Sequence, residues 1–190
     1  MEYQLLTNEE FVKALMPISD NLAGKSLAPS LMEAQEMGLK PILGSLMVTR
    51  LQELLATGEV TGDFSLDFNK DFTNGAGPVL YKTLLHKCQF YLAYKAVAEL
   101  LPKISYKINN MGLVKTSDDR VENASREEVD ANIEYYESKA DFYATEIQGW
   151  VLANIAGLPE ITATQCGKIR AHLFDAASCG IFLGGPRGRM

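Results

Sequence analysis

The sequence predicts a mainly α-helical bundle around one long central helix, with a β-hairpin and an extended C-terminal arm. Three observations lead to this fold class: a stretch at 79–101 without glycine or proline, shorter segments before it with apolar residues at helical spacing, and a heptad repeat after it. We place the helical domain at 1–154 and the arm at 155–190.

The central helix is bounded by Pro78 and Pro102, and we expect it to end at the second proline. In its first half, Lys82, His86 and Gln89 recur at spacings of four and three and form a polar stripe. In its second half, apolar side chains point in every direction around the axis. A helix that is apolar all round is a buried helix, so other elements should pack on it from several sides.

Three shorter helices precede the central one. Thr7 and Glu10 fit a capping box at the start of the first helix. Pro29 stands where a first-turn proline is tolerated and opens the second helix, which Gly38 ends. The third covers about 45–58 and carries leucines and a methionine at helical spacing.

Two non-helical segments flank the central helix. The loop at 58–78 is rich in glycine, asparagine and aspartate, and loops of this length are commonly functional or interface segments. The segment 104–115 alternates apolar and polar residues around an Asn-Asn-Met-Gly turn, which predicts a β-hairpin. Because an isolated hairpin is only marginally stable, it should lean on the helices or on a neighbouring subunit.

The last long helix starts at a second capping box, formed by Ser125 and Glu128. Its apolar residues recur at alternating spacings of four and three, and we favour an antiparallel pairing with the central helix over a coiled coil between subunits. The residues of this stripe are Val129, Ile133, Tyr136, Ala140, Tyr143, Ile147 and Trp150.

The segment after Gly157 and Pro159 has a different character. A weak helical pattern covers 165–174, and the short apolar run 181–183 is bounded by glycines and followed by two arginines. Such a segment either docks as an added strand on another surface or is a tail without a fixed partner, and both alternatives stay open.

The composition limits the classes of function that the protein can have. The chain has 190 residues, a formal net charge of −6 and a pI near 5.0, which argues against a surface built to grip nucleic-acid phosphates. Three cysteines, an odd number, favour a reducing compartment. No signal sequence opens the chain, and charged residues interrupt the only candidate membrane span. We therefore expect a soluble protein, cytoplasmic where it is made, with no membrane partner.

Three motifs resemble ligand sites but are incomplete. Residues 24–26 match the end of a phosphate-binding P-loop, but Ser19 stands where that loop needs its first glycine. Residues 67–71 imitate the start of a calcium loop, but Phe72 occupies its glycine position. We predict no enzyme, no catalytic residue, no cofactor and no metal. Whether three soft ligands without an evident fourth bind zinc stays open, and these are Cys166, His172 and Cys179.

Two short sequences and the order of the elements carry a resemblance. Residues 33–35 read EAQ, residues 39–44 read LKPILG, and the central helix contains YLAY at 91–94, followed by the hairpin and the last long helix. Over roughly 7–154 the chain resembles the head-to-tail connector, or adaptor, proteins of tailed phages, particularly those of crAss-like and related Bacteroidales phages. The closing GIFLGGPRG at 180–188 is also similar to a tail ending of virion proteins from those phages.

The resemblance implies a non-enzymatic virion protein that forms a homo-oligomeric ring, typically a dodecamer, beneath the portal at the head-tail junction. The ring would join the portal protein to further connector or tail proteins, and DNA would pass through its lumen without specific binding. Assembly would take place in the host cytoplasm. Candidate subunit or partner contacts come from the loop, the hairpin and the arm: Phe64, Leu66, Phe68, Phe72, Ile108, Met111, Leu113, Val114, Ile181, Phe182, Leu183, Arg187 and Arg189.

A second function is kept as an alternative. Several helices and the two arginines near the end of the chain, Arg187 and Arg189, also suit a small helical nucleic-acid-binding regulator or a DNA-packaging subunit.

Overall fold

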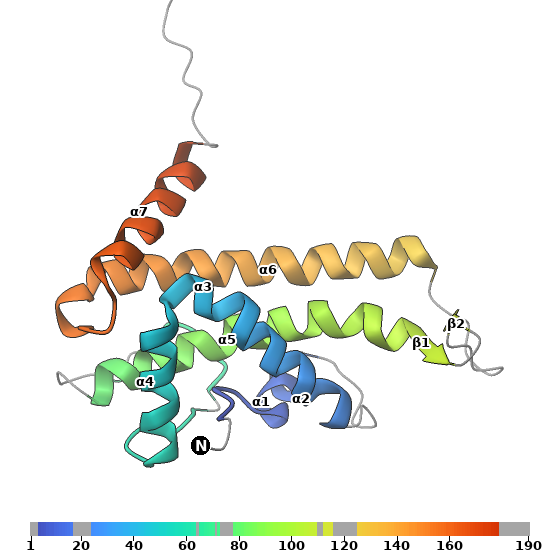
Figure 1. The fold of residues 1–190 in the computed structure, drawn as a ribbon, viewed down its shortest axis with the longest axis horizontal. Helices are drawn as coiled ribbons and strands as arrows, with labels where there is room; N and C mark the ends of the chain where they lie inside the picture. Colours follow the sequence, from blue (N-terminus) through green and yellow to red (C-terminus); the bar gives the residue numbers. More distant parts are fainter. Residues whose placement is uncertain are drawn as a thin grey trace, which may run out of the picture.

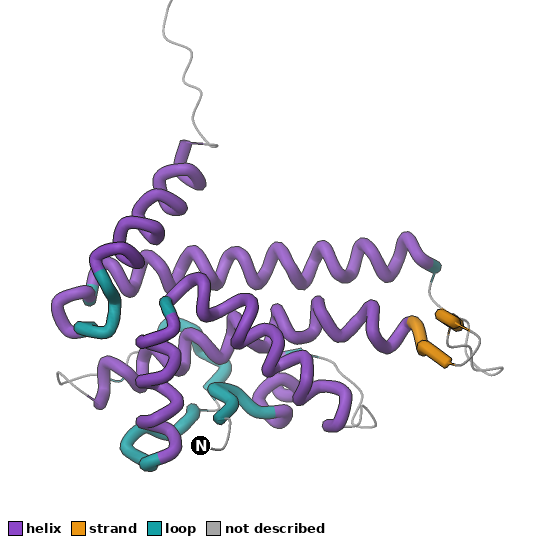
Figure 2. The backbone as a smooth tube through the Cα atoms, viewed as in Figure 1, coloured by secondary structure: helices purple, strands orange, loops and turns teal. Residues whose placement is uncertain are grey.

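The fold is that of a computed structural model, which describes residues 4–16, 24–63, 65–70, 72, 78–109, 112–115 and 125–178. Helices dominate it, which confirms the prediction of a mainly α protein (Figure 2). In chain order the elements are α1 (Glu9–Leu15), α2 (Gly24–Glu33), the π-helix η1 (Ala34–Leu39), α3 (Lys40–Leu43), α4 (Ser45–Ala56), α5 (Pro78–Ser105), β1 (Tyr106–Asn109), β2 (Gly112–Lys115), α6 (Arg126–Ala153), the 3₁₀-helix η2 (Ile155–Gly157) and α7 (Ala163–Ser178).

The long helix α5 is the centre of the core. Every residue from Thr83 to Ala93 is buried, as expected for a helix covered on all sides. The helix α6 lies beside it in antiparallel orientation, while α1 to α4 cover its other side (Figure 1). The prediction that α5 ends before Pro102 is wrong, because the helix continues to Ser105. A proline this close to a C-terminus removes one backbone hydrogen bond and leaves little helix beyond it to disrupt.

Aromatic rings join α5 to its neighbours. The ring of Phe90 lies edge-on to that of Phe11 on α1 and 5.5 Å, centroid to centroid, from that of Tyr143 on α6. Further along, Tyr94 stacks on Tyr143 at 5.3 Å. All seven residues of the predicted heptad stripe are buried or half-buried. The expected antiparallel pairing of the last long helix with the central one is therefore confirmed.

The first helix begins one residue later than predicted. Its N-cap is Asn8, whose side-chain Oδ1 accepts a hydrogen bond from the Phe11 N–H at 2.9 Å, so the Thr7 capping box is wrong. The preceding residues are held in the core, because the Leu6 N–H donates to Oε1 of the buried Gln35 on η1 at 2.9 Å. That tertiary contact places Asn8, rather than Thr7, at the start of the helix.

The second helix is longer than predicted at both ends. It begins at Gly24, so that Pro29 lies inside it, and it continues without a break through η1 and α3. Gly38 does not end it; a Cβ atom there would stand 2.5 Å from the Tyr91 hydroxyl, so this glycine makes room for a side chain of α5. The chain turns at Gly44, where φ is +86°, and α4 follows as predicted.

The strands are short. Each has four residues, and they pair antiparallel with Ile108 opposite Leu113. Ile104 and Ser105, predicted to open the hairpin, are the last residues of α5 instead. Because residues 110 and 111 lie outside the described residues, the hairpin as a complete element stays a prediction.

The core continues past the boundary placed at residue 154. Leu158, Ile161 and Ile169 belong to the same buried cluster as α5. In addition, the Gln165 side-chain amide donates to the carbonyl oxygen of Pro41 at 2.8 Å and to that of Ile42. The predicted helical piece at 165–174 is part of the longer α7, and residues 179–190 lie outside the described residues. No helix within the described ranges is long and apolar enough to cross a membrane.

Candidate subunit interface

The loop before α5 folds onto that helix instead of projecting from it. The Phe68 ring packs edge-on against Phe90 at 5.4 Å and lies 4.8 Å from the Tyr143 ring. The Lys87 ammonium donates to the Phe68 carbonyl at 3.1 Å and lies 4.3 Å from the centre of its ring. The half-buried Phe68 therefore packs against the core of its own chain, and its carbonyl is the partner that the buried Lys87 needs. A role of Phe68 in a subunit interface stays a prediction.

The same loop covers the predicted polar stripe of α5. A ring nitrogen of buried His86, Nε2, lies 2.8 Å from the Asp67 carbonyl oxygen. The Phe72 ring is half-buried between the ammonium group of Lys82, 4.6 Å from its centre, and the His86 ring. The described contacts of Phe72 are therefore made with side chains of its own chain.

The remaining interface candidates divide into three groups. Leu66 is 52% exposed and stays available to a partner. Ile108, Leu113 and Val114 lie in the paired strands, of which the structure gives the backbone register. The other predicted contacts lie outside the described residues and stay predictions: Phe64, Met111, Ile181, Phe182, Leu183, Arg187 and Arg189.

Sequence reasoning missed the solvent-facing side of α6. Tyr135 and Phe142 stand seven residues apart on one line of the helix, and they are 51% and 56% exposed. Smaller residues extend this line at the same alternating spacing of four and three. We call the line the outer stripe: Ala131, Tyr135, Ser138, Phe142, Thr145 and Gly149. In the sequence, this outer stripe is visible as a second heptad repeat, offset by two residues from the heptad stripe that packs on α5.

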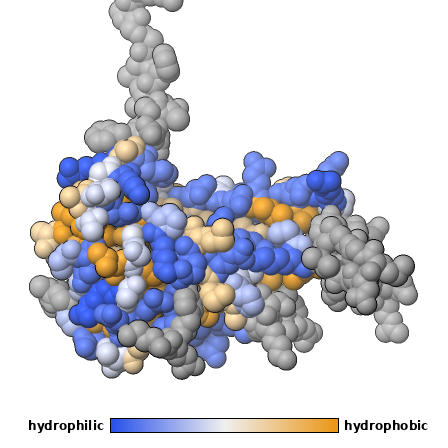
Figure 3. Space-filling view, in the orientation of Figure 1, coloured by the Kyte–Doolittle hydropathy of each residue, from blue (hydrophilic) through white to orange (hydrophobic). Residues whose placement is uncertain are grey.

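The first half of α6 is the less covered half. None of the residues 126–139 is buried, whereas Ala140, Ala144, Ile147, Gln148 and Val151 are. Figure 3 shows hydrophobic residues reaching the surface between hydrophilic ones along α6 and at the end where it meets α7. Single exposed apolar residues are ordinary, but two aromatic rings on one line of an uncovered helix are typical of a contact surface.

An acidic line runs beside the outer stripe. Its five exposed carboxylates recur at spacings of three and four, and we call it the acidic stripe: Glu127, Asp130, Glu134, Glu137 and Asp141. Two of them have a basic neighbour, Asp130 with Arg126 at 3.6 Å and Glu137 with Lys95 at 3.4 Å. Altogether α6 carries seven carboxylates and two basic residues, a formal charge of −5 in a chain of −6.

The helix α7 has the opposite charge over its described side chains, 163–173. Ile169 and Gln165 face the core, while Lys168 and Arg170 are exposed, and this part contains no carboxylate. In Figure 1, α7 rises from the end of the molecule opposite to the start of α6.

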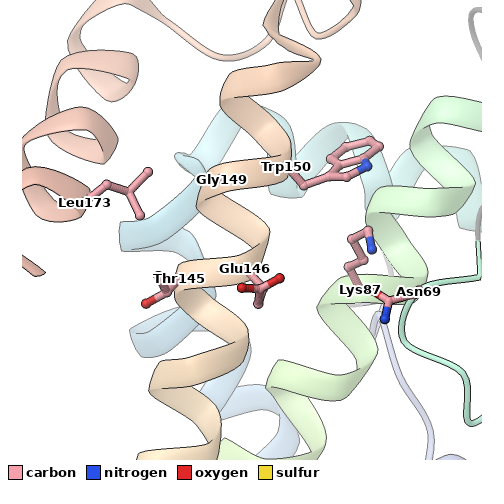
Figure 4. Close-up of a pocket in the computed structure, with 7 residues that line it drawn as sticks. All are labelled: Asn69, Lys87, Thr145, Glu146, Gly149, Trp150 and Leu173. Atoms are coloured by element: carbon pink, nitrogen blue, oxygen red, sulfur yellow. The ribbon is translucent and has the colours of Figure 1, made fainter. Parts of the chain in front are cut away.

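Two grooves border α6. One, of about 700 Å³, lies between η1, α6 and α7, and its lining includes the 71% exposed Met37 and the buried Gln148, whose Oε1 has no hydrogen-bond partner among the described residues. The other, of about 540 Å³, lies between α5, α6 and α7; Figure 4 shows Lys87 on α5 opposite Glu146 and Trp150 on α6.

The described residues give no cluster of three or more His, Cys, Asp or Glu side chains that could hold a metal ion. Cys88 is buried, and this burial raises the pKa of its thiol. Cys166 and His172 both lie on α7, and Cys179, the third ligand considered for zinc, is outside the described residues.

The described residues thus form a small helical protein in which one side of α6 is uncovered. The chain matches the profile of a protein family over residues 39–171 and belongs to it; the family is described as a family of unknown function (DUF6712). No curated protein and no solved structure matches the chain.

Proposed function

We propose that the protein is a structural, non-enzymatic ring subunit at the head-tail junction of a tailed-phage virion. It is a connector that sits below the portal, joins the portal to the tail and extends the DNA channel. The observation that carries this proposal is the uncovered side of α6, where Tyr135 and Phe142 face solvent on a helix whose first half is packed on one side only.

Ring assembly accounts for this surface. In a closed ring each subunit contacts two neighbours through different surfaces, and burying two half-exposed aromatic rings supplies a large part of the contact energy. The order of the helices and the EAQ and LKPILG sequences, which resemble those of phage connectors, support the same proposal.

The charge of the whole chain suits a channel component. With a formal net charge of −6 on each subunit, a ring would repel DNA phosphates and allow DNA to slide without being held. DNA then passes the ring without specific binding, and the portal and further connector or tail proteins are the partners. The protein assembles in the host cytoplasm and resides in the virion.

Native mass spectrometry and negative-stain imaging test the proposal directly. The purified protein, alone or mixed with purified portal, should give closed rings, with twelve copies as the expected number. A strict monomer that also fails to bind portal would refute the connector function.

Exposed Lys168 and Arg170 favour the alternative, a nucleic-acid-binding regulator or packaging subunit. That function requires a mobility shift with duplex DNA that weakens as salt is raised. We expect no shift at low salt, because the acidic α6 opposes binding.

A further inference from the structure

The acidic stripe of α6 cannot serve as its own partner. Two copies of α6 packed face to face would bring carboxylates toward carboxylates, and like charges at such spacing are destabilising. A two-fold contact uses the same patch on both subunits, so it is disfavoured here. The stripe needs a basic surface, which has to come from a different part of the neighbouring molecule.

Among the side chains that the structure describes, two basic ones have no partner of their own. Ten of the basic residues with described side chains form an ion pair, a hydrogen bond or a contact with an aromatic ring, for example Lys103 with Glu33 and Lys139 with Tyr135. Lys168 and Arg170 form none of these with the described part of the chain. Both are exposed, on opposite flanks of the buried Ile169, so they border the solvent-facing side of α7 from its two edges, and Lys168 lies on the edge next to the groove with α6.

Some exposed carboxylates of α6 also have no ion-pair partner. In the first half of α6, Glu127 and Glu134 are exposed and have no ion pair among the described residues, although Asp130 and Glu137 do. Figure 1 shows α6 starting at one end of the molecule and α7 rising near the other end.

The two surfaces also match in size. The acidic stripe extends about 21 Å along α6, and α7 is about 24 Å long, at 1.5 Å per residue. On α7, exposed Gly167 and Ala171 lie beside the basic residues, and small side chains at a contact allow two helices to approach more closely.

We infer that the acidic stripe of α6 in one copy docks on the basic, solvent-facing side of α7 in the next copy. This inference rests on the proposed ring and names the contact that builds it. Because the two surfaces differ, each subunit offers one to each neighbour, as a head-to-tail ring requires. Docking also brings the adjoining Tyr135 and Phe142 close to the same neighbour.

Charge reversal tests the contact on the full-length chain. Glu127→Lys with Glu134→Lys should raise the concentration needed for ring assembly at least tenfold, and Lys168→Glu with Arg170→Glu should do the same. The chain carrying all four changes should assemble nearly as wild type, because the charges are exchanged.

Asp141 is left unchanged, since it lines the same groove as Lys168 of its own chain. The control is Glu59→Lys, which reverses an exposed carboxylate in the turn after α4 and should leave assembly unchanged.

A second measurement uses the unmodified protein. Zero-length carbodiimide coupling, followed by mass spectrometry of the peptides, should join Lys168 to Glu127 or Glu134 in rings but not in monomers. Circular dichroism should show every variant folded, because all the exchanged residues are exposed. If wild type forms rings while both reversals assemble normally, or if the fourfold variant does not recover, the docking is refuted and the connector function stands. A wild-type monomer that ignores portal refutes the connector itself.

Discussion

Gly38 illustrates how one residue is constrained by a partner far along the chain. The Tyr91 hydroxyl occupies the space that a Cβ atom at Gly38 would need, 2.5 Å away. We expect Gly38→Ala to lower the free energy of unfolding by about 1–3 kcal/mol, the usual cost of overpacking a buried site. Chemical denaturation of the purified variant measures it.

A second substitution separates this clash from other effects of the mutation. In a Tyr91→Phe background the hydroxyl is absent, and the nearest remaining ring atom lies 3.3 Å from the Cβ position. Gly38→Ala should then be almost neutral, because alanine also favours the helix by up to about 1 kcal/mol. An equal loss of stability in both backgrounds would contradict the clash.

Tyr81 gives a pH-dependent prediction. Its burial, together with its hydrogen bonds to the Glu160 carboxylate at 2.8 and 2.9 Å, raises the pKa of the phenol to about 12 from an ordinary value near 10. Below pH 10 the phenol is neutral in both states and its contribution to stability is complete. Between pH 10 and 12 the unfolded chain ionises first, so the free energy of unfolding should fall as pH rises.

Urea denaturation from pH 9 to pH 12 measures this decline. Burial also raises the pKa of Tyr94 to about 12, and contacts with neighbouring tyrosines, Tyr143 first, add to the shift, so Tyr94 contributes in the same range. Tyr81→Phe should make the decline shallower without removing it. A decline as steep as that of wild type would show that Tyr81 does not titrate with unfolding.

At the scale of the element, α6 is a helix with two different halves. Its second half is held in the core, whereas its first half depends more on its own cap, in which Ser125 Oγ accepts from the Glu128 N–H and the Glu128 carboxylate accepts from the Ser125 N–H. These hydrogen bonds also lower the pKa of the Glu128 carboxyl. Fraying of α6 should therefore start at its beginning.

Ser125→Ala should speed amide hydrogen exchange over 126–139 and leave 140–153 unchanged. Because the affected half is not buried, the melting temperature should fall by less than about 3 °C. The matched control is Asn8→Ala, which removes the cap of α1. There Phe11 and Val12 are buried, so cap loss should lower global stability by about 0.5–2 kcal/mol. A uniform rise in exchange across α6 in Ser125→Ala would contradict local fraying.

At the scale of the whole molecule, the structure divides the arm predicted at 155–190. Up to Ile169 this part contributes buried side chains to the core, whereas 179–190 lies outside the described residues. A chain ending at 178 should therefore keep the helical fold and lose assembly strength. If its rings form and bind portal normally, the arm has no role in docking.

A chain ending at 157 should behave differently. It lacks Leu158, Ile161 and Ile169, each of which contributes about 1.5–3 kcal/mol when buried. The combined loss is a large part of the stability of a typical domain, about 5–15 kcal/mol. Thermal denaturation should show a markedly lower melting temperature than for the chain ending at 178. Equal melting temperatures would place the core boundary back at 154.

Local patterns in the sequence were enough for the helices that depend mostly on their own residues. The capping box at Ser125, the inner heptad stripe and the buried stretch of α5 could all be read from spacing, because periodicity reports which side of a helix is covered. The outer stripe was present at the same spacing. It was overlooked because a mixed line of aromatic and small residues has a weaker signal than an apolar one.

By itself, then, the sequence determined a mainly α protein in which α5 is central and α6 packs against it. Only the tertiary structure decided that Gly38 makes room for Tyr91 instead of ending a helix, that Phe68 packs against the core, and that α7 starts inside the domain. These outcomes depend on contacts between residues far apart in the chain: a hydroxyl needs space, a buried ammonium needs a carbonyl, and an apolar side chain needs a surface. No local pattern carries such information.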